Sequence, residues 1–150
     1  MQGTLISINV SEKKGEIKKP RGTAKLVQDY GIADDAHAGA ENRQVSLLDR
    51  KEIHRLETES GMELRPGEFA ENLTTENLNI KEIKLGMMVT VGSEVLLQVS
   101  QIGKECHEGC PIKEKTGRCI MPDKGIFLKV LKGGRISVGD AVNVQVGNES

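Results

Sequence analysis

Two segments of this chain repeat one pattern of glycine and apolar residues, and this repeat constrains the fold more than any other feature. The first reads GMMVTVGSEVLLQV from Gly86, and the second reads GGRISVGDAVNVQV from Gly133, 47 residues further on. In each, an apolar stretch leads to a Gly-Ser or Gly-Asp turn and then to a second stretch with alternating apolar positions, which is typical of a β-hairpin. We therefore expect residues 86–99 and 133–146 to form two similar hairpins in one closed sheet.

The rest of the chain adds further short strands and one well-signalled helix. Asp49 precedes the helical sequence RKEIHRLETES, Glu52 follows at the spacing of a capping box, and Gly61 stands where a left-handed C-terminal cap belongs. Apolar stretches predict strands over residues 2–10, 17–20 (ending at Pro20), 23–27 and 44–48. Many short strands and one clear helix predict a mainly β fold, a barrel-like closed sheet of short strands with one or a few short helices.

Two polar stretches predict loops. Residues 29–42 are rich in Gly, Ala and Asp and carry His37, while RPGEFAENLTTENLNI, residues 65–80, is too polar for a strand and too irregular for a helix. Because polar loops carry function more often than framework segments do, Glu71 and Asn72 are candidate site residues. The alternative is that both bond only to the local backbone, as Asn often does in turns.

Length, charge and composition narrow the class of protein. A chain of 150 residues predicts a single domain over residues 1–150. The net charge of −1 gives no field that would recruit nucleic acid or a membrane, and one Tyr, two Phe and no Trp do not suffice for a base-stacking platform. We find no signal peptide and no apolar run of about 20 residues. We therefore expect a cytoplasmic protein whose partners are neither nucleic acids nor membranes.

All three cysteines of the chain fall within KECHEGCPIKEKTGRCIMP, which begins at Lys104. Zinc is one interpretation, but Cys106, Cys110 and Cys119 have a Cys-x3-Cys spacing with a lone third thiol instead of two ligand pairs. A metal–sulfur cluster held by three thiolates is a second. A disulfide is a third, although it leaves one thiol unpaired and a short loop gains little from it. The odd number of thiols favours a reducing compartment.

Positive charge near these cysteines favours a reactive thiol, because a thiolate needs such neighbours. The window supplies four side chains that carry or can carry positive charge: Lys104, His107, Lys113 and Arg118. Residues 113–135 carry seven basic and two acidic side chains, which form either a solvated face or an anion-binding surface. Cys106 and Cys110 stand in polar company and are the candidate nucleophiles or metal ligands, whereas we expect Cys119 to be buried.

Two further residues have chemistry that suits an anionic ligand. His37, two residues after Asp35, can act as an acid–base group or hold an anion near neutral pH, or it is a structural histidine bonded to a backbone carbonyl. Arg43 can hold a phosphate or carboxylate with two parallel hydrogen bonds, or it forms a surface salt bridge. The sequence leaves these alternatives open.

Six motifs along the chain carry a family resemblance. In chain order they are DDAHAG (34–39), RQVSLL (43–48), PGEFAENLTTENL (66–78), IGKECHEGCPI (102–112), GRCIMPDKGIF (117–127) and GGRISVGDAV (133–142). With them the chain resembles a stand-alone MOSC domain, the module named after the C-terminal part of molybdenum cofactor sulfurases. The resemblance implies a β-rich, barrel-like domain, in agreement with the hairpin pattern.

The resemblance also implies sulfur or molybdenum-cofactor chemistry at Cys106 or Cys110, which would carry sulfur as a persulfide or ligate molybdenum. It implies a pocket for the molybdenum–pterin cofactor (molybdopterin). The residues that would line this pocket are His37, Arg43, Glu71 and Asn72, and the basic residues that would bind the phosphate of the cofactor are Lys113 and Arg118. The implied partners are a pyridoxal-phosphate-dependent cysteine desulfurase or a molybdenum-cofactor enzyme. The alternative is a non-catalytic module that is stabilised by zinc or stores the cofactor, and the sequence leaves open whether the chain is an enzyme.

Overall fold

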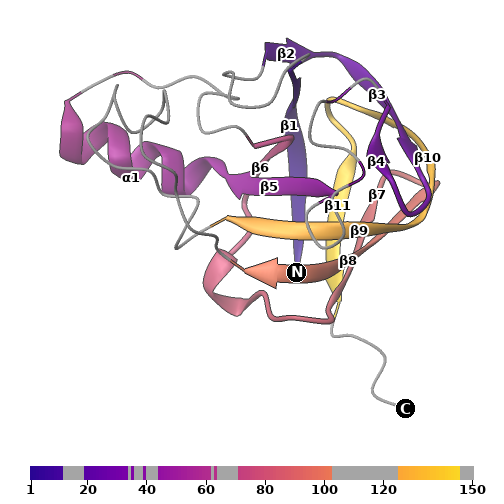
Figure 1. The fold of residues 1–150 in the computed structure, drawn as a ribbon. Helices are drawn as coiled ribbons and strands as arrows, with labels where there is room; N and C mark the ends of the chain where they lie inside the picture. The colour runs from indigo at the N-terminus through magenta and orange to yellow at the C-terminus, as the bar shows by residue number, and fades with distance from the viewer. Residues whose placement is uncertain are drawn as a thin grey trace.

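The computed structural model describes residues 1–11, 19–33, 35, 39, 44–61, 63, 71–102 and 125–145. In these residues the chain is built mainly of short strands (Figure 1). The strands are β1 (Gln2–Val10), β2 (Lys19–Arg21), β3 (Thr23–Val27), β4 (Gly31–Ile32), β5 (Val45–Asp49), β6 (Leu73–Glu76), β7 (Met88–Val91), β8 (Val95–Ile102), β9 (Ile126–Lys132), β10 (Gly134–Ser137) and β11 (Ala141–Gln145). The helices are α1 (Arg50–Ser60) and the short 3-10 helix η1 (Ile80–Glu82).

Seven of these strands close into a barrel. Hydrogen-bonded neighbours follow the order β11-β7-β8-β9-β5-β6-β1, and β1 pairs again with β11, from Gln2↔Asn143 to Thr4↔Ala141. The barrel is mixed, because β5 and β6 run parallel and the other pairs are antiparallel. β2 extends the sheet from β1, and β10, β3 and β4 form a second, three-stranded sheet beside the barrel (Figure 1). The predicted mainly β, barrel-like fold is confirmed.

Apolar side chains from every barrel strand fill the interior. They are Leu5, Ile8, Val45, Leu47, Leu73, Val89, Val91, Val95, Leu97, Val99, Ile126, Leu128, Val130, Val142 and Val144. Leu26, Ile32 and Ile136 of the small sheet pack onto the same core. A barrel of this size has an interior that side chains fill, so we look to the outer wall for a site.

The outer wall at β1, β5 and β6 is also buried. A register shift between Leu5 and Ser7 places both Leu5 and Ile8 in the core, so that Ser7 and Asn9 face the other way. The same alternation places Ser46 of β5, between Val45 and Leu47 of the core, and Thr74 of β6, after Leu73 of the core, on the outer side. The buried polar residues that face outward on these strands are Ser7, Asn9, Ser46 and Thr74.

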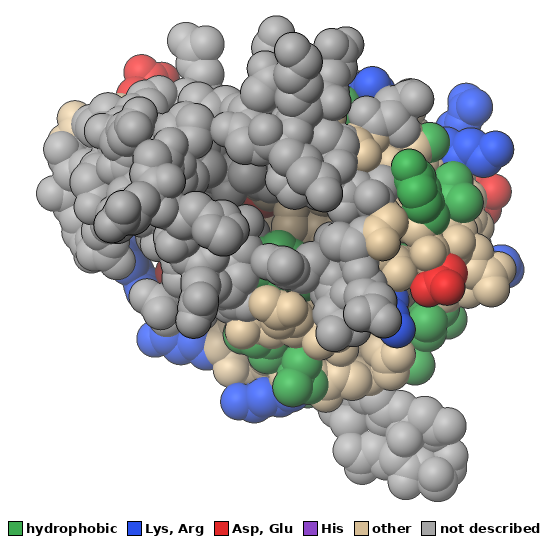
Figure 2. Space-filling model, in the orientation of Figure 1, with side chains coloured by type: hydrophobic (Ala, Val, Ile, Leu, Met, Phe, Trp, Pro, Cys, Tyr) green, Lys and Arg blue, Asp and Glu red, His purple; other side chains and the backbone are tan. Residues whose placement is uncertain are grey.

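The described charges lie mostly toward the edges of the face seen in Figure 1. Figure 2 shows that hydrophobic side chains, backbone atoms and other uncharged side chains make up most of the described surface near the centre of this face. Described Lys and Arg side chains lie at its lower left and upper right edges (Figure 2). The centre of the described surface therefore offers apolar contact and hydrogen bonding more than charge.

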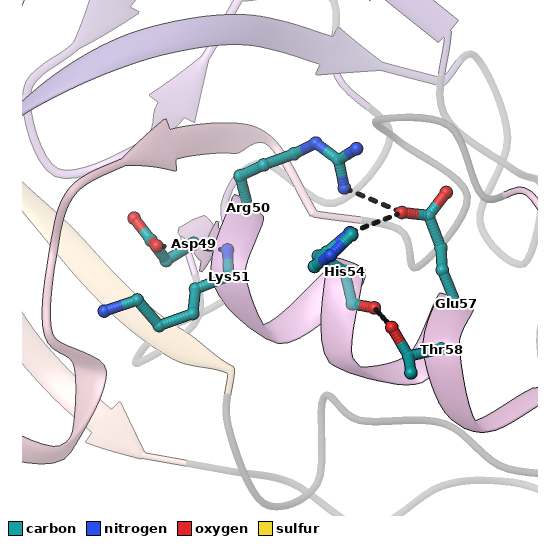
Figure 3. A network of polar contacts seen from close by, with 6 residues as sticks. All are labelled: Asp49, Arg50, Lys51, His54, Glu57 and Thr58. Carbon is teal, nitrogen blue, oxygen red and sulfur yellow. Dashed lines mark hydrogen bonds and ion pairs between the residues drawn. The ribbon is translucent and has the colours of Figure 1, made fainter.

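Helix α1 packs on the outer wall against β5 and β6. Asp49 caps the helix as predicted, because its side chain accepts a hydrogen bond from the backbone N–H of the second helical residue. Gly61 ends the helix in the left-handed conformation, with φ 73°. Along the helix, Glu57 Oε1 lies 3.0 Å from Arg50 Nη1 and 3.5 Å from His54 Nδ1 (Figure 3). The predicted helix is confirmed with both of its caps.

Of the two repeated segments, the first forms the predicted hairpin and the second does not. β7 and β8 pair in antiparallel register across Gly92. In the second segment β10 pairs with β3, whereas β11 pairs with β7 and β1. The turn between β10 and β11 is a corner: Gly139 (φ 100°) donates its N–H to the Leu5 carbonyl, and Leu5 donates its N–H to the Asp140 carbonyl. The hairpin predicted over residues 133–146 is wrong, because these bonds to β1 direct β11 into the barrel.

The stretch over residues 65–80 is not all loop, because it contains β6 and begins η1. β6 lies between β5 and β1, and its two threonines are buried. Thr74 donates its hydroxyl to Glu71, and Thr75 donates its hydroxyl to Asp49. Polar side chains that have such partners are stable in a central strand. The polar composition of this stretch therefore gave the wrong prediction for β6.

Three smaller differences concern strand limits. β4 lies inside the loop predicted over residues 29–42, and β5 begins and ends one residue later than the predicted 44–48. Pro20 lies within β2 and not at its end. Among the described strands, β2 pairs with β1 alone, and such an edge strand tolerates a residue without a backbone N–H.

Candidate functional site

Among the predicted site residues, the structure describes Glu71 and Asn72. Both precede β6 directly, and their exposed fractions are 0% and 1%. The others lie outside the described residues: His37, Arg43, Cys106, Cys110, Lys113 and Arg118. Their roles stay predictions, and the described part of the site consists of Glu71, Asn72 and the residues that hold them.

Asn72 joins β1 to β5. Its backbone N–H donates to the Ser46 carbonyl at 3.1 Å and to Ser46 Oγ at 2.9 Å, and its Oδ1 accepts from the Ser46 N–H at 2.9 Å. On its other side, Asn72 Nδ2 donates to the Asn9 carbonyl at 3.1 Å, and the Asn9 N–H donates to the Asn72 carbonyl at 2.7 Å. These bonds fix the start of β6 between two strands, and with it the position of Glu71.

Three consecutive side-chain hydrogen bonds lead to Glu71. Ser7 Oγ donates to Asn9 Oδ1 at 2.7 Å, and Asn9 Nδ2 donates to Thr74 Oγ1 at 3.0 Å. Thr74 Oγ1 then donates to Glu71 Oε2 at 2.7 Å. In this hydrogen-bond chain each side chain donates to the next one, and the last acceptor is the Glu71 carboxylate.

These side chains form a buried polar layer on the outer wall of the barrel. Its members are Ser7, Asn9, Ser46, Glu71, Asn72 and Thr74, each 6% exposed or less. Outward-facing polar side chains of a sheet commonly meet water. Burying polar groups costs free energy unless they are hydrogen-bonded, and here each of them has partners within the protein.

Two buried side chains hold the ends of the segment 35–44, which contains the predicted site residues His37 and Arg43. Asp35 Oδ1 accepts from the Ser11 N–H at 3.1 Å, directly after β1. Gln44 Oε1 accepts from the Val130 N–H of β9 at 3.0 Å. The segment therefore begins beside the end of β1 that carries the polar layer, and it ends on the barrel wall.

The part of the chain that the structure describes contains neither a cluster of metal-ligating side chains nor a helix that could span a membrane. Among these residues, no group of three or more His, Cys, Asp or Glu side chains is arranged to hold a metal ion. None of the described helices is long and apolar enough to span a membrane. The predicted metal-binding thiols lie outside the described residues, so that metal binding stays a prediction.

The sequence did not reveal the partners of Glu71 and Asn72. Ser7 and Asn9 lie in TLISINV, and Ser46 lies in QVSLL, and both stretches have the apolar character of a strand. A polar residue at alternate positions of a strand is the one available signal. It is equally typical of a solvated face, so it does not reveal a buried network.

Comparison with known proteins identifies the family. The model of the MOSC domain matches residues 34–143. This chain belongs to the MOSC domain family. The matched region contains every predicted site residue, from His37 to Arg118. MOSC domains are associated with molybdenum cofactor sulfurase-like proteins.

Solved structures share the fold of this MOSC domain. The YuaD protein from Bacillus subtilis is 16% identical, with a TM-score of 0.81 over 99% of this chain and 98% of that chain. YiiM from Geobacillus stearothermophilus is 21% identical, with a TM-score of 0.73 over 97% of this chain and 75% of that chain. YiiM from Escherichia coli is 18% identical, with a TM-score of 0.71 over 100% of this chain and 72% of that chain. None of the curated proteins matches the chain. At these identities the likeness shows the fold alone.

Proposed function

We propose that this MOSC domain binds a molybdenum–pterin cofactor, or carries sulfur to it, through a thiol of Cys106 or Cys110. The observation that carries the proposal is the family match over residues 34–143, which contains both thiols and all the residues predicted to line the pocket. We assign this chemistry to the cytoplasm, because a reducing compartment keeps thiols free.

The described residues suit such a cofactor in the chemistry of their polar groups. A pterin ring carries N–H donors together with nitrogen and oxygen acceptors. The polar layer offers carboxylate, amide and hydroxyl groups, which can support a pocket that recognises a ring of this kind. Because Glu71 and Asn72 are buried in the barrel wall, we assign them to the support of the pocket.

The remaining predicted residues complete the proposal. His37 and Arg43 would meet the cofactor from the segment whose ends are held by Asp35 and Gln44. Basic residues after the cysteines would bind the terminal phosphate: Lys113 and Arg118. When bound, the cofactor supplies a redox-active metal for which a thiolate is a suitable ligand.

In the sulfur-carrier form of the proposal, the donor is a persulfide on a cysteine desulfurase. The thiolate of Cys106 or Cys110 attacks the outer sulfur of that persulfide. A new S–S bond forms, the donor S–S bond breaks, and the donor cysteine leaves as a thiolate. The transferred sulfur keeps its proton and its oxidation state, so that the step needs neither an oxidant nor a reductant.

We expect Cys106 or Cys110 to accept persulfide sulfur, and to react with iodoacetamide, well before Cys119. Positive neighbours raise the thiolate fraction at the first two thiols, whereas Cys119 lies beside apolar residues. Peptide mapping after brief labelling measures the order. Intact mass under gentle, non-reducing conditions shows whether whole sulfur atoms or a cofactor are attached to the chain.

The cysteine variants provide matched controls for this experiment. Cys119→Ser should take up sulfur and cofactor as the unmodified protein does, and either Cys106→Ser or Cys110→Ser should lose most of both. If Cys119 labels first, the assignment of the reactive thiol fails. If Cys106→Ser and Cys110→Ser both retain sulfur transfer and cofactor binding, the proposed function of these thiols is wrong.

A further inference from the structure

Two buried carboxylates accept hydrogen bonds from adjacent threonines of β6. Thr75 donates to Asp49 Oδ1 at 2.8 Å, and Thr74 donates to Glu71 Oε2 at 2.7 Å. Asp49 has an evident structural role, because it also accepts the Leu78 N–H at 3.0 Å and caps α1. Glu71 differs from Asp49, because its Oε2 accepts from Thr74 at the end of a series of side-chain hydrogen bonds, whereas Asp49 bonds to the backbone of a helix.

The chemistry of the side chains determines which atom donates and which accepts at each step of this hydrogen-bond chain. A threonine hydroxyl has one proton, and the Thr74 oxygen already accepts from Asn9 Nδ2, so that its proton is given to Glu71. The Asn9 amide cannot turn over without loss, because its Oδ1 accepts from the Ser7 hydroxyl. Hydrogen bonds in such a chain polarise one another. The result is a Glu71 carboxylate oxygen held as the acceptor of the Thr74 hydroxyl proton.

Burial makes this arrangement costly. Glu71 is 0% exposed, and a buried carboxylate costs free energy that an apolar side chain of similar size would avoid. Asn9 and Thr74 are also 0% exposed, so that the hydrogen-bond chain buries two further polar side chains besides Glu71. Stability alone does not account for such a layer on the outer wall of a barrel whose interior is apolar.

We propose that Thr74 is a positioning residue of the candidate site. Through the hydrogen-bond chain that begins at Ser7 and Asn9, it holds the Glu71 carboxyl group in place as a buried hydrogen-bond acceptor for an N–H donor in the cofactor pocket. Asn72, adjacent to Glu71 in the sequence, fixes the backbone at the same point. This inference rests on the proposed cofactor binding and adds a residue that acts through Glu71.

The test compares Thr74→Val with Thr75→Val. Both residues are 0% exposed, and each variant loses one hydrogen bond from a threonine hydroxyl to a carboxylate. Thr74→Val also loses the hydrogen bond that Thr74 accepts from Asn9 Nδ2, which is the link of the proposed hydrogen-bond chain. The full chain is purified from a host that makes the cofactor, and molybdenum and pterin are measured per folded chain. We expect Thr74→Val to hold about tenfold less of both, Thr75→Val to match the unmodified protein, and Thr74→Ser to restore the loading.

Ser7→Ala gives a second measurement if Thr74→Val does not fold. It removes the first donor of the chain and should lower the loading about threefold in the same direction. Equal loading of Thr74→Val and the unmodified protein, an equal loss in Thr75→Val, or full loading of Ser7→Ala would overturn the inference while the proposed function stands. An unmodified protein without molybdenum and pterin would instead remove the proposed function, and this inference with it.

Discussion

Replacing Asp49 with alanine should lower the free energy of unfolding by about 3 to 5 kcal/mol. The side chain is 1% exposed, and its Oδ1 accepts from the Thr75 hydroxyl at 2.8 Å and from the Leu78 N–H at 3.0 Å. Its Oδ2 accepts from the Lys51 N–H at 3.2 Å (Figure 3). Alanine would leave the two buried donors without this acceptor, at about 1 to 2 kcal/mol each, and would remove a helix cap of about 1 kcal/mol. Denaturant unfolding followed by circular dichroism measures the loss.

Asp140→Ala is the matched control. Asp140 Oδ2 accepts from the Ser137 N–H at 2.8 Å in a partly buried turn, so that its loss should cost only about 1 kcal/mol. Asp49→Asn should fall between the two, since an amide keeps one acceptor oxygen. Equal losses for Asp49→Ala and Asp140→Ala would show that Asp49 does not join β5, β6 and α1 in the way described.

Gly3→Ala should destabilise the protein by about 2 to 3 kcal/mol. Gly3 lies where the barrel closes, paired with Val142 of β11. A Cβ at this position would lie 2.5 Å from the Glu76 carbonyl oxygen and 2.9 Å from the side chain of Leu78. The carbonyl belongs to the neighbouring strand and Leu78 is buried in the core, so neither can move away without disturbing the closure. The shift of the urea midpoint at constant slope measures the effect.

Gly22→Ala separates this steric effect from a general effect of removing glycine. A Cβ at Gly22 would meet no atom within 4 Å, so that the substitution should change stability by no more than about 0.5 kcal/mol. If Gly3→Ala is as mild as Gly22→Ala, β1 does not pack against β6 and β11 as closely as the structure has it.

Local signals in the sequence predicted the elements that depend on local chemistry. The strand over residues 2–10, the strand over 23–27 and the helix that follows Asp49 have the predicted limits. Each depends on a pattern within a few residues, such as alternating apolar positions or the caps at Asp49 and Gly61. The barrel-like fold class followed from the number of such strands.

Elements that depend on distant partners could not be predicted in this way. β6 is stable as a strand because its threonines bond to residues on other elements, and β11 turns away from β10 because of bonds to Leu5. The same limit applies to the site. Glu71 and Asn72 were visible as polar residues in a polar stretch, but Asn9 meets Asn72 across 63 positions and Thr74 across 65. No local pattern encodes contacts of that range.

The metal and pterin content of the freshly purified, unmodified chain decides whether this MOSC domain binds a molybdenum–pterin cofactor or carries sulfur to it. The chain is produced in a host that makes the cofactor, purified without reductant or chelator, and analysed for molybdenum, zinc, pterin and attached sulfur in one sample. We expect molybdenum together with pterin, or sulfur on Cys106 or Cys110, and no stoichiometric zinc. Zinc at one equivalent per chain, without molybdenum, pterin or bound sulfur, would contradict the proposed function and would favour a zinc-stabilised, non-catalytic module.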